Sequence, residues 1–321
     1  MPDRNTPLIS FVITFYNLPA EWLRECLDSI LALSLSRSER EVIVVDDGSA
    51  TSPAPALADY ADDIIYIRQP NKGLSEARNA GLGIASGSYV QFVDGDDRLV
   101  TKAYEQCLDI VRFNAPDVVM FDRVSHEGAV PAVARPRLTD GTALLAGANL
   151  KAAAWGYVFR RSLLGGLRFT PGLLHEDEEF TPLLLLNASR IFQTDSKAYF
   201  YRLRDSSIMS RKDRKHILKR LNDLERIILR LSSVAATLPA EKAGALGRRV
   251  AQLTMDYLYN TITLTSSRSQ LAARTARLRA AGLYPLPRRN YSLKYVAFSR
   301  LANSKTGLAL LNGILKNKTR K

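Results

Sequence analysis

The stretch "GSYVQFVDGDD", residues 87–97, joins a strand-forming run to three carboxylates that lie within four positions. Asp94, Asp96 and Asp97 should repel one another at such short spacing. A folded protein usually avoids that cost or offsets it with a bound cation. Aromatic and β-branched residues before the acids are typical of a strand. We therefore expect an acidic turn at the carboxyl end of a buried strand.

The residues around this stretch alternate between strand and helix patterns over positions 8–124. Near-continuous apolar runs predict buried parallel strands, and apolar residues at helical spacing predict amphipathic helices. Strands are expected at 8–16, 41–45, 63–67, 88–93 and 117–121, and helices at 19–33, 74–85 and 101–111. This order implies an α/β fold with a mainly parallel central sheet and helices on both faces.

Two acidic turns should share one edge of that sheet. "DDGS", with Asp46 and Asp47, follows the second strand, and "DGDD" follows the fourth. Ligands of open α/β sheets bind beyond the carboxyl ends of the strands. Clustered carboxylates there suit Mg²⁺ or Mn²⁺, although Asp and Gly are also ordinary turn residues. Neither a G-x-G-x-x-G nor a G-x-x-x-x-G-K-[ST] pattern follows the first strand, which argues against dinucleotide and P-loop sites.

The composition is that of an ordinary globular chain. Its 321 residues are 46% hydrophobic and 24% charged, without an apolar run long enough for a membrane span or the layout of a signal peptide. Cys26 and Cys107 are expected to be small buried hydrophobic residues in a reducing compartment. The three histidines have no spacing typical of zinc ligands.

Charge divides the chain unevenly. The net charge is −6 over residues 1–210 and +19 over residues 211–321. The basic part carries helical patterns at 215–231, 248–264 and 271–283, and the "YPLPRRN" break at 284–290 is expected to end this bundle. In residues 306–321, Leu308, Leu311, Ile314 and Leu315 form one apolar stripe beside lysines. That pattern favours an amphipathic helix on an anionic membrane surface, and docking on the protein's own core is the alternative.

Five stretches in order resemble family 2 glycosyltransferases of the GT-A fold, of the bacterial capsular or exopolysaccharide type. These stretches are "ISFVITFYN", "VIVVDDGS", "NKGLSEARNAGL", "GSYVQFVDGDD" and "HEDEEF". The resemblance covers residues 8 to about 210. It implies a GT-A nucleotide-sugar-binding domain at 1–210, followed by a basic helical domain at 211–321 that associates with the membrane or the acceptor.

The resemblance implies a site for a nucleotide sugar. Asp47 would accept from the uracil N3–H with support from Asp46, and Arg78 would lie over the base or the pyrophosphate. The residues expected to bind the donor are Thr14, Tyr16, Asp46, Asp47, Gly73, Arg78, Asn79, Asp94, Arg202 and Arg204. Asn79 would hold its loop, and the two later arginines would meet the pyrophosphate when the segment 199–210 closes as a lid. Asp94, Asp96 and Asp97 would hold Mg²⁺ or Mn²⁺.

The resemblance also implies the chemistry. Asp177 of "HEDEEF" would be the general base of a single inverting displacement, with Glu176 and His175 holding or tuning it. Acids in a first helical turn also have a purely structural explanation, because the helix dipole favours them. Trp155 would offer a flat face to the acceptor sugar. Gly156 and Tyr157 replace the family's usual basic position, so acceptor handling should differ.

The expected function is metal-dependent, inverting transfer of a hexosyl-type sugar from a UDP-sugar or similar donor. The acceptor is expected to be a saccharide, lipid-linked, in cell-surface polysaccharide biosynthesis, at the cytoplasmic face of the membrane and without nucleic acid. The alternatives are a haloacid-dehalogenase-type phosphatase, a basic nucleic-acid-binding protein and a binding homologue without catalysis. Arg98 and Leu99 after the acids do not fit the phosphatase pattern.

Overall fold

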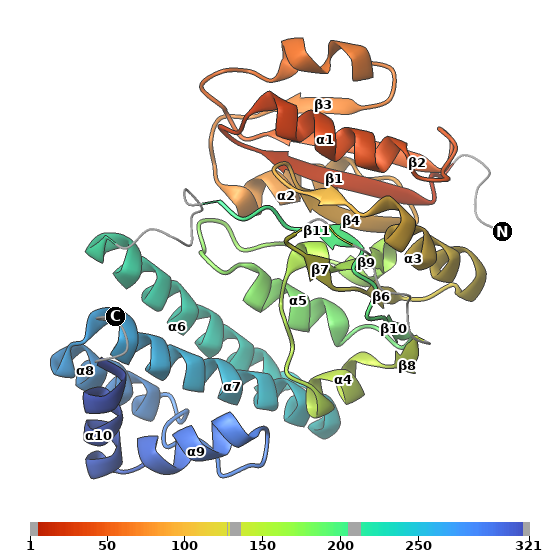
Figure 1. Cartoon of the computed structure of the whole chain (residues 1–321). Coiled ribbons are helices and arrows are strands. Elements are labelled where there is room, and N and C mark those ends of the chain that lie inside the picture. Colours follow the sequence, from red (N-terminus) through yellow and green to blue (C-terminus); the bar gives the residue numbers. More distant parts are fainter. Residues whose placement is uncertain (1–5, 127, 129–135, 205–212, 317–321) are drawn as a thin grey trace. The chain divides into compact units, whose positions relative to one another are not determined.

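The computed structural model describes residues 6–126, 128, 136–204 and 213–316, which form two compact units (Figure 1). The first unit comprises Met1–Gly141 and Lys151–Arg204, and the second comprises Thr142–Leu150 and Asp205–Lys321. The segment 142–150 thus groups with the basic helices, although it lies inside the predicted domain 1–210. The predicted boundary at residue 210 itself lies outside the described residues, as do residues 205–209 of the expected lid.

The first unit is built around a sheet of mixed direction. Its strands are β1 (Ile9–Phe15), β2 (Arg40–Asp46), β3 (Ile65–Arg68), β4 (Tyr89–Asp94), β6 (Val118–Met120), β8 (Arg137–Thr139), β9 (Tyr157–Arg160) and β10 (Ile191–Gln193). The spatial order is β3-β2-β1-β4-β9-β6-β10-β8. β1, β2, β3 and β4 pair in parallel, and β6 pairs in parallel with β10. β9 runs antiparallel between β4 and β6. The sheet is therefore mainly parallel, as predicted.

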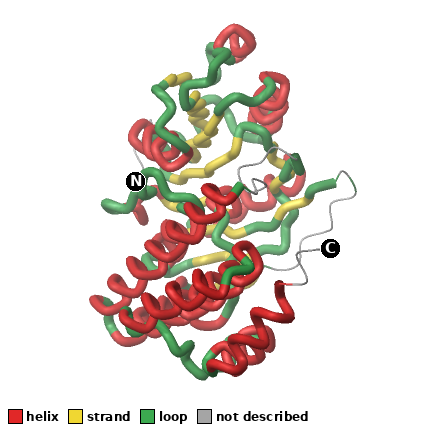
Figure 2. Tube along the Cα trace, turned by 90° about the vertical axis from the view of Figure 1, so that its left-hand side faces the viewer, coloured by secondary structure: helices red, strands yellow, loops and turns green. Residues whose placement is uncertain are grey.

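Helices cover both faces of this sheet (Figure 2). The helices and 3₁₀ turns of the unit are α1 (Ala20–Leu31), η1 (Ala54–Tyr60), α2 (Leu74–Ile84), α3 (Thr101–Asn114), η2 (Ala154–Gly156), η3 (Arg161–Leu164) and α5 (Asp177–Leu185). Alternate residues of β1 point to opposite faces. Phe11 and Ile13 belong to one buried cluster with Leu27 of α1 and Leu108 of α3. On the opposite face, α2 packs against β1 and β2.

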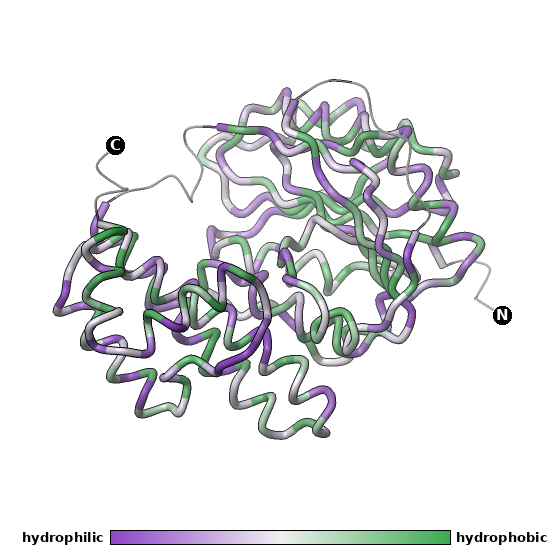
Figure 3. The backbone as a smooth tube through the Cα atoms, turned by 60° about the horizontal axis from the view of Figure 1, so that its bottom comes forward, coloured by the Kyte–Doolittle hydropathy of each residue, from purple (hydrophilic) through white to green (hydrophobic). Residues whose placement is uncertain are grey.

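The central strands β1, β2 and β4 are buried along most of their length, which is why their sequences read as nearly continuous apolar runs. All seven residues of β1 are buried, and these strands are among the most hydrophobic segments in Figure 3. Each predicted strand and helix of residues 8–124 is present. Several short elements were not predicted, among them η1, the antiparallel β9 and a small second sheet of β5 (Arg98–Leu99), β11 (Tyr199–Phe200) and β7 (Arg123–Val124).

The second unit is helical. Its elements are α4 (Gly141–Gly147), α6 (Arg214–Thr237), α7 (Ala240–Thr265), α8 (Arg268–Ala280), α9 (Leu293–Ala302) and α10 (Lys305–Lys316). The predicted apolar face of α6 is used, because Leu221, Leu224, Ile228 and Leu231 are buried. The expectation that residues 284–290 end the bundle is wrong, since α9 and α10 follow and both pack on α7. The helix α9 was missed at the sequence level.

The predicted stripe on α10 is divided between packing and exposure. Leu311 is buried, and Leu308 and Leu315 are half-buried, whereas Ile314 is exposed by 52%. Part of the stripe therefore docks on the protein's own core, which was the alternative interpretation. Residues 317–321 of this segment lie outside the described residues. None of the described helices combines the length and apolar character that a bilayer crossing needs.

Two glycines of α2 offer a matched test of how tightly this helix sits on the sheet. A Cβ at Gly81 would lie 2.2 Å from Val12 Cγ1, whereas one at Gly83 would meet nothing within 4 Å. We expect Gly81→Ala to lower the free energy of unfolding by about 1–3 kcal/mol through overpacking. Gly83→Ala should raise it by about 0.4–1 kcal/mol, because it restricts the unfolded chain. Urea titration measures both, and equal effects would contradict the close packing.

Candidate functional site

The carboxyl ends of β1, β2 and β4 form one edge of the sheet, where the predicted residues gather. Thr14 pairs in register with Asp94, and Phe15 pairs with Asp46. The backbone N–H of Gly95 donates to Thr14 O at 2.9 Å, and a Cβ at Gly95 would lie only 2.8 Å from that oxygen. Glycine is therefore required for the "DGDD" turn to close onto β1. Tyr16, just beyond β1, is 46% exposed.

The "DDGS" turn is fixed from inside by Asp46. Its buried carboxylate accepts from the Ser49 backbone N–H at 2.9 Å and from the Tyr66 hydroxyl at 3.1 Å. Arg68 adds an ion pair, with 3.2 Å between Nε and Oδ2. A carboxylate with three donors is well compensated for its burial. Asp46 thus holds the turn in shape, and its support of Asp47 at a nucleotide base stays a prediction.

Asp47 connects this turn to the start of α2. Its Oδ1 accepts from the Gln69 side chain at 2.7 Å and from the Lys72 backbone N–H at 2.9 Å. Its Oδ2 accepts from the Gly73 N–H at 2.8 Å. Gly73 precedes α2 with a φ of 89°, a left-handed conformation that glycine adopts readily. Asp47 therefore shapes the loop from which α2 begins, and its contact with a nucleotide base stays a prediction.

Arg78 of α2 links two of the acidic clusters. Its guanidinium is buried and pairs with Asp94 Oδ1 at 3.0 Å and with Glu176 Oε1 at 2.6 Å. Burial lowers the pKa of Arg78, but the carboxylates of Asp94, Glu176 and Asp177 outweigh burial and raise it above its usual value. "DGDD" and "HEDEEF", which are far apart in the sequence, therefore lie on either side of one cation.

Aromatic rings complete the surroundings of this guanidinium. It lies 5.8 Å from the ring centre of Phe92 and 5.3 Å from that of Phe169. Phe169 stacks on Phe180 of α5 at 3.9 Å between centres. Contact with ring faces favours the planar cation of arginine over lysine. The position of Arg78 is therefore set by both charge and packing.

Asn79, the next residue, holds the loop before α5. Its side-chain amide donates to Phe169 O at 2.8 Å, and its carbonyl accepts from the Phe169 N–H at 2.9 Å. These two bonds imitate a strand pair between α2 and a loop about 90 residues later. Two consecutive residues of α2 therefore act on the segment before α5: Asn79 holds Phe169, and Arg78 pairs with Glu176.

The carboxylates of Asp96 and Asp97 have different partners. Asp96 pairs with Arg204, with 2.6 Å between Oδ2 and Nε. Asp97 accepts from the Tyr199 hydroxyl at 2.8 Å and from the Arg202 backbone N–H at 2.7 Å. Burial raises the pKa of Asp97 to about 8, and the charges of Asp94 and Asp96 add to this rise. Burial and Asp94 also raise the pKa of Asp96. Both shifts have the direction that the predicted repulsion among the acids of this turn would give.

The residues after β11 fasten onto the "DGDD" turn. The Nε–H of Arg202 donates to Asp96 O at 2.8 Å, and its Nη2 pairs with Glu25 at 2.5 Å. Its guanidinium also lies 5.0 Å from the ring centre of Trp22. Arg202 and Arg204, both expected to meet a pyrophosphate, are thus held at the acidic turn in this structure.

Trp155 stacks on Tyr199, with 4.5 Å between ring centres and 16° between planes. The hydroxyl of that tyrosine donates to Asp97 and accepts from the Asp94 backbone N–H. Arg123 lies 6.0 Å from the Trp155 ring centre. Tyr199 therefore links Trp155, the predicted acceptor residue, to the acidic turn. Tyr199 was missed at the sequence level, because only the arginines of its segment carried a recognisable signal.

The "HEDEEF" acids lie at the start of α5. His175 has a φ of 64°, Glu176 precedes the helix, and Asp177 is its first residue. Burial raises the pKa of Asp177 well above its ordinary value, the charges of Glu176 and Glu178 add to this, and Arg78 opposes it. A carboxylate with a raised pKa accepts a proton more readily, which is a property of general bases.

The carboxylates of the "DGDD" turn are the type of ligand that a hard divalent cation prefers, but their present arrangement does not form a ready site. Asp94 and Asp96 offer oxygen ligands, and the raised pKa values of Asp96 and Asp97 mean that a nearby cation would relieve their repulsion. Among the described residues, no three His, Cys, Asp or Glu side chains converge as a ready metal site. Arg78 and Arg204 neutralise two of these acids instead.

Comparison with known proteins identifies the first unit. Residues 10–164 match the family described as "Glycosyl transferase family 2". Residues 10–164 form a family 2 glycosyltransferase domain. The chain is 30% identical over 219 residues to the uncharacterized glycosyltransferase EpsJ of Bacillus subtilis, covering 63% of each chain. The chain thus spans less than two thirds of that relative. The match does not favour the phosphatase or nucleic-acid alternatives.

Solved structures show that the family 2 domain has the GT-A fold. TarS of S. aureus in complex with UDP-GlcNAc is similar with a TM-score of 0.70 at 18% identity, over 97% of this chain and 91% of that one. The mannosyltransferase PcManGT of Pyrobaculum calidifontis, solved with GDP-Man and Mn²⁺, gives a TM-score of 0.55 at 17% identity, over 98% and 87%. At these identities the likeness establishes the fold.

The family 2 domain should depend on Arg78 for stability. Arg78→Met leaves the buried Glu176 carboxylate and the Asp94 carboxylate without their cation. We expect the free energy of unfolding to fall by about 3–5 kcal/mol, as when one partner of a buried pair is removed. The control is Arg24→Met, which breaks the exposed ion pair with Asp59 and should change stability very little. Similar urea midpoints for the two variants would contradict the central place of Arg78.

Proposed function

We propose that this protein is an inverting glycosyltransferase that uses a nucleotide-diphosphate sugar, with UDP-sugar as the expected donor. The observation that carries the proposal is the paired contact of Arg78 with Asp94 and Glu176, which brings the "DGDD" and "HEDEEF" acids together. The family match and the GT-A fold support the same reaction class. TarS and PcManGT were solved with nucleotide sugars, which supports a donor of this kind.

The donor would lie along the edge formed by the ends of β1, β2 and β4. Thr14, Tyr16 and the "DDGS" turn would contact the base and ribose, with Asp47 and Gly73 shaping the adjoining loop. Arg202 and Arg204 lie at the acidic turn, where a diphosphate would also need cationic partners. Arg78 would act by fixing Asp94 rather than by contacting the base, because its guanidinium is already paired and buried.

Asp94 and Asp96 are the residues that would hold Mg²⁺ or Mn²⁺. Both oxygens of Asp97 accept hydrogen bonds from Tyr199 and Arg202, so we assign Asp97 mainly to positioning the turn. A bound cation would neutralise charge on the diphosphate as it leaves. Arg204 would have to share or release Asp96 when a cation binds, because it now pairs with that carboxylate.

Asp177 would take the proton from the attacking acceptor hydroxyl. The hydroxyl oxygen forms a bond to the anomeric carbon while the bond to the diphosphate breaks, and the electron pair leaves with the nucleotide diphosphate. A single displacement inverts the anomeric configuration. Glu176 is engaged with Arg78 and would hold the base in place. The raised pKa of Asp177 suits proton acceptance.

The acceptor would approach beside Trp155, as a saccharide that is lipid-linked. The half-buried ring is stacked on Tyr199 and so is rigid, which favours a sugar platform. The second unit would associate with an anionic membrane at the cytoplasmic face. Basic residues and the exposed Leu310 and Ile314 of α10 support this placement.

Replacement of the proposed base tests the reaction. Asp177→Asn should lower turnover by about 10²–10⁴-fold, as expected for loss of a general base. Donor affinity should be retained, because the substitution leaves the donor-binding residues in place. The assay is release of nucleotide diphosphate from a panel of nucleotide sugars. Glu178→Gln makes the same chemical change one residue later and should keep most of the activity. Full activity of Asp177→Asn would remove Asp177 from this role.

Replacement of a proposed metal ligand should affect donor binding. Asp96→Asn should weaken donor binding measured with Mg²⁺ or Mn²⁺ by at least ~10-fold. Loss of a residue that only supports a metal ligand already costs about 10-fold or more in metal affinity or activity, and loss of a ligand should cost no less. Binding measured with a chelator should be similar in both proteins. The exposed Asp62→Asn is the control for charge. An unchanged, metal-dependent affinity in Asp96→Asn would contradict the assignment of this ligand.

A further inference from the structure

The second unit contains a basic pocket that the proposed reaction does not use. It has a volume of about 380 Å³ and is lined by residues from the segment after α8 and from one face of α9: Arg288, Arg289, Asn290, Val296, Ser299, Arg300 and Asn303. Three of these residues are arginines, and none is an acid. We propose that this pocket binds the terminal phosphate of a membrane lipid. The inference rests on the proposed membrane association and adds a specific site to it.

The arginines are held in place by a fixed backbone. The N–H of Leu286 donates to Asn303 Oδ1, and the Asn303 amide donates back to Leu286 O, both at 2.8 Å. The Tyr295 hydroxyl donates to Pro287 O at 2.9 Å. The residues immediately before Arg288 are thus tied to α9 at two points. A site whose backbone is already ordered loses less entropy when it binds a ligand.

Charge and geometry favour a phosphate ligand. Val296, Ser299, Arg300 and Asn303 follow one another at the spacing of a single helical face, so Arg300 lies on the side of α9 that the loop covers. Among the described residues, no ion pair is recorded for the three arginines. The planar, multiply donating guanidinium matches phosphate oxygens well. The pocket contains three positively charged side chains and no acidic residue, so an anion would be a favourable ligand.

Exposed apolar surface beside the pocket favours a lipid over a soluble anion. Leu293, at the start of α9, is 92% exposed, although it is a large apolar residue. It precedes Val296 by three positions and so extends the same helical face. A leucine next to a phosphate site can insert among acyl chains while the arginines remain at the headgroup level. A soluble phosphate ligand would leave this leucine without a function.

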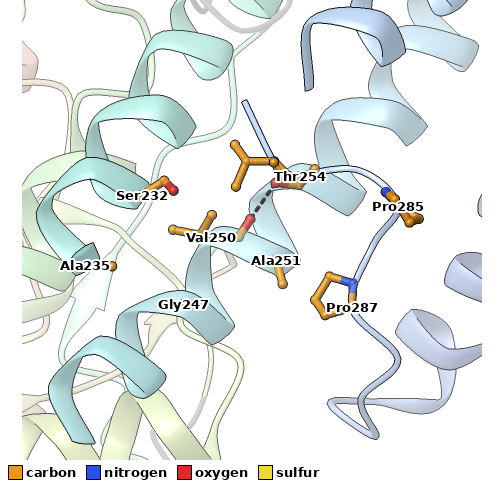
Figure 4. Close-up of a pocket in the computed structure, with 10 residues that line it drawn as sticks. Ser232, Ala235, Gly247, Val250, Ala251, Thr254, Pro285 and Pro287 are labelled. Carbon is orange, nitrogen blue, oxygen red and sulfur yellow. Dashed lines mark hydrogen bonds between the residues drawn. The ribbon is translucent and has the colours of Figure 1, made fainter. Parts of the chain in front are cut away.

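A second pocket is lined by the loop residues that immediately precede those of the basic pocket. Pro285 and Pro287 line it together with small residues of α6 and α7, among them Ser232 and Gly247 (Figure 4). Its volume is about 240 Å³. Within it the Thr254 hydroxyl donates to the Val250 carbonyl at 2.7 Å, so this polar group is already satisfied. A pocket lined mainly by apolar residues and a basic pocket, on neighbouring residues of one loop, suit an amphiphilic ligand.

Vesicle binding by the full chain tests the proposal. The probes are phosphatidylcholine vesicles containing phosphatidic acid and phosphatidylcholine vesicles containing oleic acid, matched in surface charge. We expect tighter binding to phosphatidic acid. Arg288→Ala with Arg289→Ala should weaken it about 30-fold, since each basic residue near an anionic surface contributes about 1 kcal/mol. The matched control, Lys242→Ala with Arg268→Ala, removes the same charge from other helices and should lose less than about 3-fold.

Two further arms separate the possible ligands. Leu293→Ser should weaken binding to phosphatidic acid vesicles and leave binding of inorganic pyrophosphate unchanged. Pyrophosphate bound as tightly as the vesicles, with Leu293→Ser without effect, would overturn the lipid assignment in favour of a soluble anion. Single-stranded RNA that displaces the vesicles at equal phosphate concentration would also overturn it.

The controls distinguish this site from general membrane association. Equal losses in the two double variants, with equal binding to both vesicle types, would overturn the pocket and leave a general electrostatic attraction. No binding of the unaltered protein to either vesicle would overturn both the pocket and the membrane proposal. Thermal unfolding of each variant identifies any loss that arises from misfolding. Activity on a soluble acceptor should be unchanged in all of these variants, because their residues lie outside the proposed catalytic site.

Discussion

The buried guanidinium of Arg78 is the interaction on which the acidic edge of this fold depends. Without it, the buried Glu176 carboxylate and the partly exposed Asp94 carboxylate would lack the charge that compensates them. The cation is itself costly to bury, so it is retained only because the acids and two ring faces compensate for it. The burial of each of these charged groups is therefore compensated by the opposite charges beside it.

The other two acids of the turn are also held by partners, one by a cation and one by neutral donors. Arg204 pairs with Asp96, and Asp97 receives donors from Tyr199 and the Arg202 backbone. The short strand β11 brings these groups to the turn, since Tyr199 pairs in register with Leu99 just after the acids. The small second sheet, whose Leu99 and Tyr199 are buried in the core cluster, thus also orders the carboxylates.

The sequence predicted the elements of residues 8–124 because their apolar runs and helical spacing are local signals. It also predicted that "DDGS" and "DGDD" share an edge, since parallel strands end on the same side. The contact of Arg78 with Glu176 spans 98 positions and has no local signal. Tyr199 was missed for the same reason. The helix α9 was missed because Pro285 and Pro287 suggested an end, whereas the chain resumes a helix three residues beyond the break at 284–290, at Leu293.

The short segment 142–150 has a consequence for how the chain can be divided. Buried Arg248 donates to Leu145 O and Ala148 O, and buried Arg249 donates to Leu150 O at 3.0 Å. Carbonyl groups of residues 142–150 thus accept hydrogen bonds from two arginines of α7, although the sequence on both sides of this segment belongs to the first unit. A fragment starting at residue 211 would bury two guanidinium groups with those carbonyls missing. The second unit is therefore built from two separate stretches of sequence, so no single cut of the chain separates the two units.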